Sequence, residues 1–322
     1  MDQLLGPIQK EIDLFERRLD EMLRSDVEMV HQVARYMAAL KGKRLRPALA
    51  VVCTKATGSW DDRVIDAGVA VEMIHAATMI HDDVVDRAET RRGKPSVNSK
   101  WNDHTAVMFG DFLFARALSL LVGLGNRDAL AAVSGATERL IQGEIHESQI
   151  SLQRDTRESS YFAMVGDKTA SLISASCRIG PLIAGAPERT AEALGKYGEY
   201  LGLAFQIADD MLDFTGDADT MGKPVGSDLR EGKITLPLIR ALASARDGER
   251  QRIEATLRRE DQAESDWEEV VHFVETQGGI GSAAEEARRY AGMARECLKG
   301  LEPSVPLAIL ETAARLVVER EN

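Results

Sequence analysis

Residues 72–86 read EMIHAATMIHDDVVD, and this stretch indicates both a helical fold and a charged site. Its apolar residues would cover most of a helix surface, so the helix is expected to be largely buried. Asp82 and Asp86 are four residues apart, and on a helix their carboxylates share one face. Like charges at this spacing repel, and a bound divalent cation would relieve the repulsion. A solvated acidic face is the alternative for a single cluster.

A second cluster favours the cation. Residues 208–213 read ADDMLD and follow the apolar stretch YLGLAFQIA at 200–208, so Asp209 again comes at the end of an apolar helix. Two such clusters could face each other across a cavity. Oxygen ligands that leave room for water and phosphate suit Mg²⁺, and several Mg²⁺ ions between the clusters would hold a diphosphate.

Composition limits the class of protein. The chain has 322 residues, 44% of them hydrophobic, and 52 acidic against 40 basic residues give a net charge of -12. Disorder and general nucleic-acid binding are therefore disfavoured. No charge-free stretch approaches the roughly 18 apolar residues of a membrane helix, so we expect no transmembrane segment. The scattered Cys53, Cys177 and Cys297 suit a reducing, cytoplasmic location.

Helical periodicity dominates the chain, and no series of alternating strands is evident. Residues 88–98 and 215–232 are predicted to be loops. No linker divides the sequence, so residues 1–322 are predicted to form a single all-α domain. Helices are expected at about 5–23, 47–57, 62–87, 100–123, 127–150, 157–184, 189–214, 234–245, 249–260, 264–276, 280–299 and 304–320.

Basic residues gather at two places. Lys43 and Arg46 lie just before Pro47 in the sequence. Proline suits the first turn of a helix, and a helix N-terminus with basic neighbours is a favourable binding site for phosphate. Arg91 and Arg92 follow the first acidic cluster, and arginine binds phosphate oxygens in bidentate fashion. Taken alone, each group could also be a solvated turn.

The sequence resembles the trans-isoprenyl (polyprenyl) diphosphate synthases, and most closely the bacterial medium- and long-chain, octaprenyl-type synthases. The resemblance follows the chain in order through GKRLRP at 42–47, EMIHAATMIHDDVVD at 72–86, RRG at 91–93, GDFL at 110–113, GDKT at 166–169, FQIADDMLD at 205–213 and GKITLP at 232–237.

The resemblance implies a bundle of long helices around a deep cavity, a homodimer, and Mg²⁺-dependent condensation of isopentenyl diphosphate onto an allylic diphosphate. It also implies residue roles. The metal ligands would be Asp82, Asp86 and Asp209, supported by Asp83, Asp210 and Asp213. The allylic diphosphate would contact Arg91, Lys168 and Lys233, with Lys223 among the substrate-binding residues, and isopentenyl diphosphate would contact Lys43, Arg46, His75 and Arg92. Thr169 and Gln206 would line the allylic cation, so the catalytic set would be Asp82, Asp86, Lys168, Thr169, Gln206 and Asp209.

Product length in this family depends on the side chains below the first aspartate cluster. Ala77 and Thr78 are small, and short-chain members typically carry an aromatic residue there. We therefore expect a medium or long polyprenyl product, such as a quinone side-chain precursor, with peripheral membrane association possible for its release. The alternatives are a geranylgeranyl or farnesyl diphosphate synthase, a class I terpene cyclase and a non-catalytic regulatory subunit.

Overall fold

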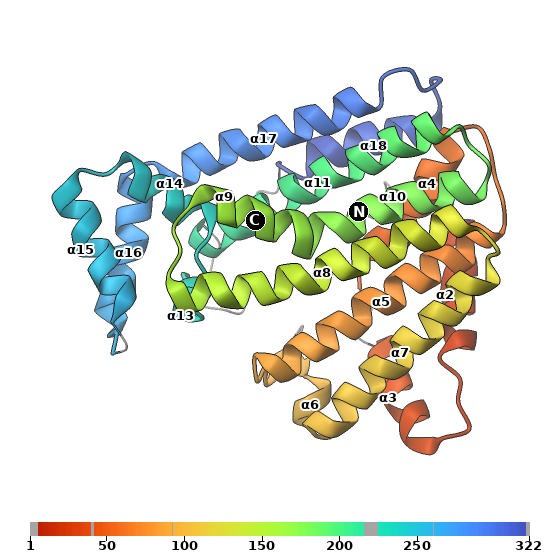
Figure 1. The fold of residues 1–322 in the computed structure, drawn as a ribbon, viewed down its shortest axis with the longest axis horizontal. Helices are drawn as coiled ribbons and strands as arrows, with labels where there is room; N and C mark the ends of the chain where they lie inside the picture. The colour runs from red at the N-terminus through yellow and green to blue at the C-terminus, as the bar shows by residue number, and fades with distance from the viewer. Residues whose placement is uncertain (1–5, 40–41, 92, 216–224, 260, 320–322) are drawn as a thin grey trace. The chain divides into compact units, whose positions relative to one another are not determined.

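The computed structural model describes residues 6–39, 42–91, 93–215, 225–259 and 261–319. Helices account for nearly all of the regular structure in these ranges (Figure 1). The strands found there are β1 (Thr90–Arg91) and β2 (Lys94–Pro95), which pair antiparallel within the loop expected at 88–98. The prediction of an all-α fold is confirmed.

The chain forms two compact units, each assembled from segments far apart in sequence. One comprises Met1–Thr137, Leu172–Gly198 and Leu298–Glu311, and the other comprises Glu138–Ser171, Glu199–Cys297 and Thr312–Asn322. The prediction of a single domain over residues 1–322 stays a prediction.

The first unit is organised around a helix that carries the first acidic cluster. α5 packs against α2, α4 and α7. Fourteen of its 23 residues are buried, which explains why its sequence is apolar on nearly every side. The helices and turns of this unit are η1 (Gly6–Ile8), α2 (Gln9–Met22), α3 (Glu28–Ala39), α4 (Leu45–Ala56), α5 (Arg63–Val85), α6 (Val97–Lys100) and α7 (Asp103–Gly123), with the first parts of α8 (Arg127–Gln153), α11 (Glu188–Thr215) and α18 (Val305–Leu316) and nearly all of α10 (Ser171–Ile183).

The second unit has its own hydrophobic core, which includes Tyr161, Ile207, Leu236 and Phe273. The helix expected at 157–184 is interrupted here by one π-helical turn, η2 (Gly166–Ala170). Single π-helical turns inside α-helices are frequent at functional sites. This unit contains the later parts of α8 and α11 together with α9 (Glu158–Val165), η2, α13 (Ser227–Arg230), α14 (Leu236–Ser244), α15 (Asp247–Arg258), α16 (Glu264–Thr276) and α17 (Gly279–Cys297).

Within the ranges that the structure describes, two helices are long and apolar enough to cross a membrane by length and composition alone. The apolar windows of α5 and α7 have mean hydropathies of 1.3 and 1.6, and 72% and 39% of them are buried within the protein. Both helices contain charged residues, so the prediction that no charge-free stretch approaches this length is not contradicted, and the absence of a transmembrane segment stays a prediction. α5 passes the test because it is a core helix. α7 keeps several apolar side chains exposed, among them Met108, Leu118 and Val122.

Three short or weakly patterned helices were not predicted. α3 buries only Val33 and Ala34 fully, and Met29 in its first turn is 46% exposed, so its pattern marks a core face poorly. α6 and α13 are single turns of four residues. Their hydrogen bonds depend on partners elsewhere in the chain, which a local pattern does not reveal.

Candidate active site

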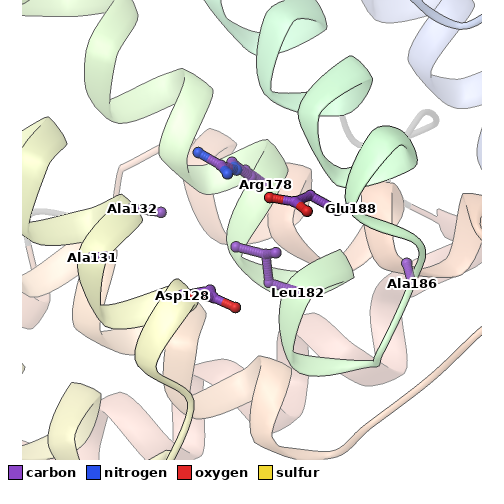
Figure 2. A pocket seen from close by; sticks show the side chains of 7 residues that line it. All are labelled: Asp128, Ala131, Ala132, Arg178, Leu182, Ala186 and Glu188. Carbon is purple, nitrogen blue, oxygen red and sulfur yellow. The ribbon is translucent and has the colours of Figure 1, made fainter.

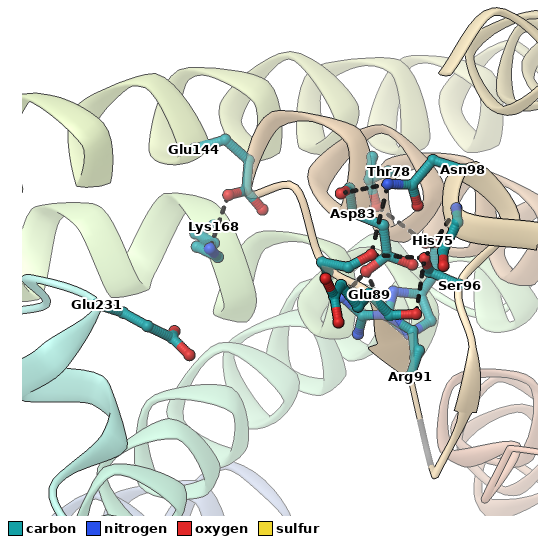
Figure 3. Close-up of polar contacts among 12 residues, drawn as sticks. His75, Thr78, Asp83, Glu89, Arg91, Ser96, Asn98, Glu144, Lys168 and Glu231 are labelled. Carbon is teal, nitrogen blue, oxygen red and sulfur yellow. Dashed lines mark hydrogen bonds and ion pairs between the residues drawn. The ribbon is translucent and has the colours of Figure 1, made fainter. Parts of the chain in front are cut away.

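The three acids of the first cluster, at the end of α5, differ in how far they are buried. The amide of Asp86 donates to the carbonyl of Asp82 at 2.8 Å, so the two residues keep the helical spacing that the sequence predicts. Asp86 is exposed and Asp82 is half-buried. Asp83 is buried, and its Oδ1 accepts bonds from Arg91 Nε at 2.7 Å and Nη2 at 2.6 Å (Figure 3). Asp83 thus holds the hairpin residue Arg91 against the helix.

Burial also affects the charge of Asp83. Loss of water around the carboxyl raises its pKa, while the adjacent Arg91 guanidinium acts in the opposite direction. On the preceding turn, the Thr78 hydroxyl donates to the carbonyl of His75 at 2.9 Å. Ala77 is fully buried and Thr78 is 7% exposed, so both predicted chain-length positions face into the protein.

The basic residues at the start of α4 have different surroundings. Arg44, which belongs to the basic stretch before Pro47 but has no predicted substrate role, pairs with Glu16 at 2.7 Å and Glu72 at 3.0 Å. Lys43 is exposed. Arg46 has a buried Nε with no hydrogen-bond partner among the residues that the structure describes, and burial lowers the pKa of its guanidinium despite the nearby Glu72. A buried donor left without an acceptor costs free energy, so Arg46 is suited to receive an anionic ligand.

The second cluster, on α11, is divided in the same way as the first. Asp209 is exposed, whereas Asp210 and Asp213 are 5% and 4% exposed. Asp213 accepts from the Ser227 hydroxyl at 2.7 Å and from the Asp228 amide at 3.2 Å. It therefore caps the short helix α13 and fixes the chain after the second cluster.

Lys168 lies in the π-helical turn η2 and is held by two carboxylates of α8. Its Nζ is 2.7 Å from Glu144 Oε2 and 2.5 Å from Glu147 Oε2. Burial lowers the pKa of this lysine, but the two carboxylates outweigh burial and keep its pKa above the ordinary value. The sequence predicts Lys168 but gives no sign of its partners.

A chain of hydrogen bonds links the next residue of the turn to the second acidic cluster. The Thr169 hydroxyl donates to Gln206 Oε1 at 2.8 Å, and Gln206 Nε2 donates to Asp210 Oδ1 at 2.8 Å. Tyr161 donates to the other oxygen of Asp210 at 2.6 Å. Burial raises the pKa of Asp210 to about 8, against the effect of the hydrogen bonds from Tyr161 and Gln206. Tyr161 is absent from the sequence-derived site, because no motif includes it.

The remaining predicted lysines and arginines fall in two groups. Lys233 lies 2.7 Å from Glu231 and 3.8 Å from Asp228. Burial lowers its pKa, but these carboxylates outweigh burial and raise it overall. Arg92 and Lys223 lie outside the described residues.

The oxygen donors fit a hard cation such as Mg²⁺. In the first unit, Asp82 and Asp86 offer two carboxylates on one helical turn, and in the second unit Asp209 offers one. Across the parts of the chain that the structure describes, no three or more His, Cys, Asp or Glu side chains are grouped so that they alone could hold a metal ion. Water and diphosphate oxygens would have to complete the coordination, which is usual for Mg²⁺.

A separate pocket in the first unit is not part of this site. It has a volume of about 330 Å³ and is lined by Arg178, Asp128 and Glu188 with small and apolar residues between them (Figure 2). None of the sequence-predicted site residues lines it. Its charged groups come from the first turns of α8 and α11 and from α10.

Comparisons with known proteins identify the family of this chain. Residues 27–274 match the family model described as polyprenyl synthetase. The chain is 35% identical over 98% of its length to the all-trans-nonaprenyl-diphosphate synthase (geranyl-diphosphate specific) of Rhodobacter capsulatus, covering 97% of that protein. It is 33% identical over its full length to all of a short chain isoprenyl diphosphate synthase of Methanothermobacter thermautotrophicus.

A solved structure is equally similar. The polyprenyl synthase of Caulobacter crescentus, crystallised with calcium and isoprenyl diphosphate, superposes with a TM-score of 0.92 at 34% identity, covering 99% of this chain and 97% of that one. The chain therefore belongs to the polyprenyl synthetase family. It is a prenyltransferase of the prenyl diphosphate synthase class.

Proposed function

We propose that this protein condenses isopentenyl diphosphate head-to-tail onto an allylic diphosphate with Mg²⁺ as cofactor. The observation that carries this proposal is the division of each acidic cluster. Asp83 and Asp210 are buried and bonded to protein side chains, whereas Asp86 and Asp209 are exposed. Each cluster therefore buries at least one acid within the protein and keeps another acid at the surface.

The chain's own residues supply the remaining chemistry. Mg²⁺ neutralises the diphosphate charge and so makes diphosphate a better leaving group. Arg46, with Lys43 and His75, binds isopentenyl diphosphate and holds its double bond near the reacting carbon. The oxygens of Thr169 and Gln206 stabilise the allylic cation without the nucleophilic strength of a carboxylate. The departed diphosphate accepts the proton that the new bond releases.

The product is proposed to be a medium or long polyprenyl diphosphate of the kind that supplies quinone side chains. Ala77 and Thr78 are small and buried directly before the first cluster, where a bulky residue would stop a growing chain. The relatives themselves range from a nonaprenyl synthase to a short chain synthase. Sequence similarity alone therefore does not fix the length.

The direct test is product analysis. The pure protein is incubated with isopentenyl diphosphate, farnesyl diphosphate and Mg²⁺, and the products are dephosphorylated and sized by chromatography. We expect products longer than geranylgeranyl. Parallel reactions lack either isopentenyl diphosphate or Mg²⁺. Turnover without isopentenyl diphosphate would indicate a terpene cyclase, and no turnover with any primer would indicate a regulatory subunit.

A homodimer in the cytoplasm is proposed as the working form. α7 exposes Met108, Leu118 and Val122 at 55%, 57% and 61%, and a second copy could cover this apolar face. Light scattering of the Leu118→Glu variant should then give a monomer where the wild type gives a dimer.

Peripheral association with membranes would assist release of a long product. Flotation of the wild-type protein with phospholipid vesicles tests whether it associates in this way.

A further inference from the structure

We propose that Tyr161 is a positioning residue that orients the carboxamide of Gln206 through the carboxylate of Asp210. This inference rests on the proposed function, because it assigns Gln206 its orientation toward the allylic cation. Tyr161 lies on α9, outside every motif that the sequence analysis identified. Its ring is 1% exposed and its hydroxyl donates to Asp210 Oδ2 at 2.6 Å.

The carboxylate of Asp210 is fixed from both sides. One oxygen accepts from the Tyr161 hydroxyl, and the other accepts from Gln206 Nε2 at 2.8 Å. Gln206 and Asp210 are four residues apart on α11, so the second bond follows the helix axis. The tyrosine ring is itself held, with the ring of Phe162 edge-on at a centroid distance of 5.3 Å. The hydroxyl therefore acts as a rigid donor.

A fixed Asp210 carboxylate determines the orientation of the Gln206 side-chain amide. When Asp210 is ionised, only the NH₂ end can donate to it, and reversing the amide would place two acceptor oxygens together. Gln206 Oε1 must then point to Thr169, and the Thr169 hydroxyl donates to it at 2.8 Å. The hydroxyl proton of Thr169 is therefore used in this bond, and the lone pairs of the hydroxyl oxygen can accept other contacts.

The result is a pair of neutral oxygens with preset orientation beside η2. Neutral amide and hydroxyl oxygens stabilise developing positive charge, and they do so best when their dipoles need no reorganisation during the reaction. Without the Tyr161 hydroxyl, Asp210 keeps its bond to Gln206 but can rotate. The carboxamide would then sample orientations in which Oε1 no longer serves the cation.

Tyr161→Phe tests this directly, because it removes one oxygen and keeps the buried ring. We expect the single-turnover rate of condensation to fall about tenfold, less than the 10²–10³ typical of losing a direct stabilising group. KM for both diphosphates should change less than twofold, since no substrate contact is lost. Single-turnover measurement is needed because product release can limit steady-state rates.

Tyr197→Phe is the matched control. Tyr197 is also fully buried, and its hydroxyl donates to the carbonyl of Leu310 at 2.9 Å; neither residue belongs to the predicted site. Both variants lose one buried hydrogen bond. Only Tyr161→Phe should lose rate, and an equal loss in both variants would overturn the proposal in favour of a general structural effect.

A Gln206→Ala background identifies the route. If Tyr161 acts through Gln206, Tyr161→Phe should cause no further loss of rate once the carboxamide is gone. A further tenfold loss in that background, or an unchanged rate of Tyr161→Phe alone, would overturn the inference. These outcomes are distinct from failure of the proposed function, in which the wild-type protein itself would not condense the two diphosphates.

Discussion

The ammonium group of Lys168 lies 2.7 Å from a carboxylate oxygen of Glu144 (Figure 3). Glu147, one turn later on α8, lies 2.5 Å from the same ammonium. Two carboxylates thus share one cation, and the side chains of all three residues are about three-quarters buried. A diphosphate that binds Lys168 must compete with this pair. The pair also holds the lysine in place before substrate arrives.

Replacing Lys168 should destabilise the protein, because Glu144 and Glu147 would lose their shared cation. We predict that Lys168→Met lowers the free energy of unfolding by about 1–3 kcal/mol, because two half-buried negative charges lose their shared partner. Adding Glu147→Gln should restore part of that loss, since it removes one of the two charges. Urea denaturation of both single variants and the double variant measures the coupling. Additive effects would show that the three charges are independent.

α8 can pack closely against η2 because Gly143 has no side chain. A Cβ at Gly143 would lie 2.3 Å from the backbone nitrogen of Lys168 and 2.7 Å from its Cα. We predict that Gly143→Ala pushes α8 away from the turn, destabilises the protein by about 1–3 kcal/mol and raises KM for the allylic diphosphate. Thermal unfolding and initial rates measure the two effects.

Gly135 provides the control on the same helix. A Cβ there would meet nothing within 4 Å. Gly135→Ala should therefore stabilise the protein by about 0.5–1 kcal/mol through helix propensity and leave KM unchanged. If the two alanine variants behaved alike, the close contact at Gly143 would not be what positions Lys168.

The sequence predicted the fold class and the long helices because both follow from local apolar periodicity. α5 is apolar over most of its length and α11 is apolar over residues 200–208, and each apolar stretch ends at an acidic cluster, so the C-terminal limits of both helices were clear. The π-helical turn η2 was not predictable, since the residues GDKTA have no pattern that distinguishes it from an α-helical turn. α3 was missed because it buries only two residues fully.

Partners within the site were equally hidden from the sequence. Spacing placed Asp82 and Asp86 on one helical face, but it could not show that Asp83 is bonded to Arg91 across a hairpin. Tyr161 and Asp210 are 49 residues apart. Such pairs depend on tertiary packing, which a single sequence does not encode in any local pattern.

Substitutions of the neighbouring residues Asp82 and Asp83 should have different effects on activity and stability. We predict that Asp82→Asn lowers turnover at least about 10³-fold and shifts its Mg²⁺ dependence to higher concentration, because a metal ligand is lost. Its melting temperature should change little. Asp83→Asn should instead lower the melting temperature, since the half-buried Arg91 loses its charged partner at 2.6 Å.

Mg²⁺ titration of activity and thermal unfolding separate the two variants. Retained turnover in Asp82→Asn would exclude this residue as a metal ligand. An unchanged melting temperature in Asp83→Asn would contradict the supporting role that its burial indicates.

Product length should respond to the volume at Ala77. Ala77 is fully buried one and a half turns before Asp82, on the helix that carries the first cluster. We predict that Ala77→Phe blocks elongation there and shortens the main product by several isoprene units. The ring must also find space in a packed interior, so a loss of about 1–3 kcal/mol in stability is expected. Chromatography of the dephosphorylated products and a melting curve measure both effects.

Ala77→Ser distinguishes volume from other consequences of substitution at this position. Serine is nearly as small as alanine, so a growing chain should pass it and the product distribution should stay that of the wild type. If Ala77→Phe remains folded and active yet gives products of wild-type length, the growing chain does not pass Ala77. The gate would then have to lie deeper than the turn that carries Ala77 and Thr78.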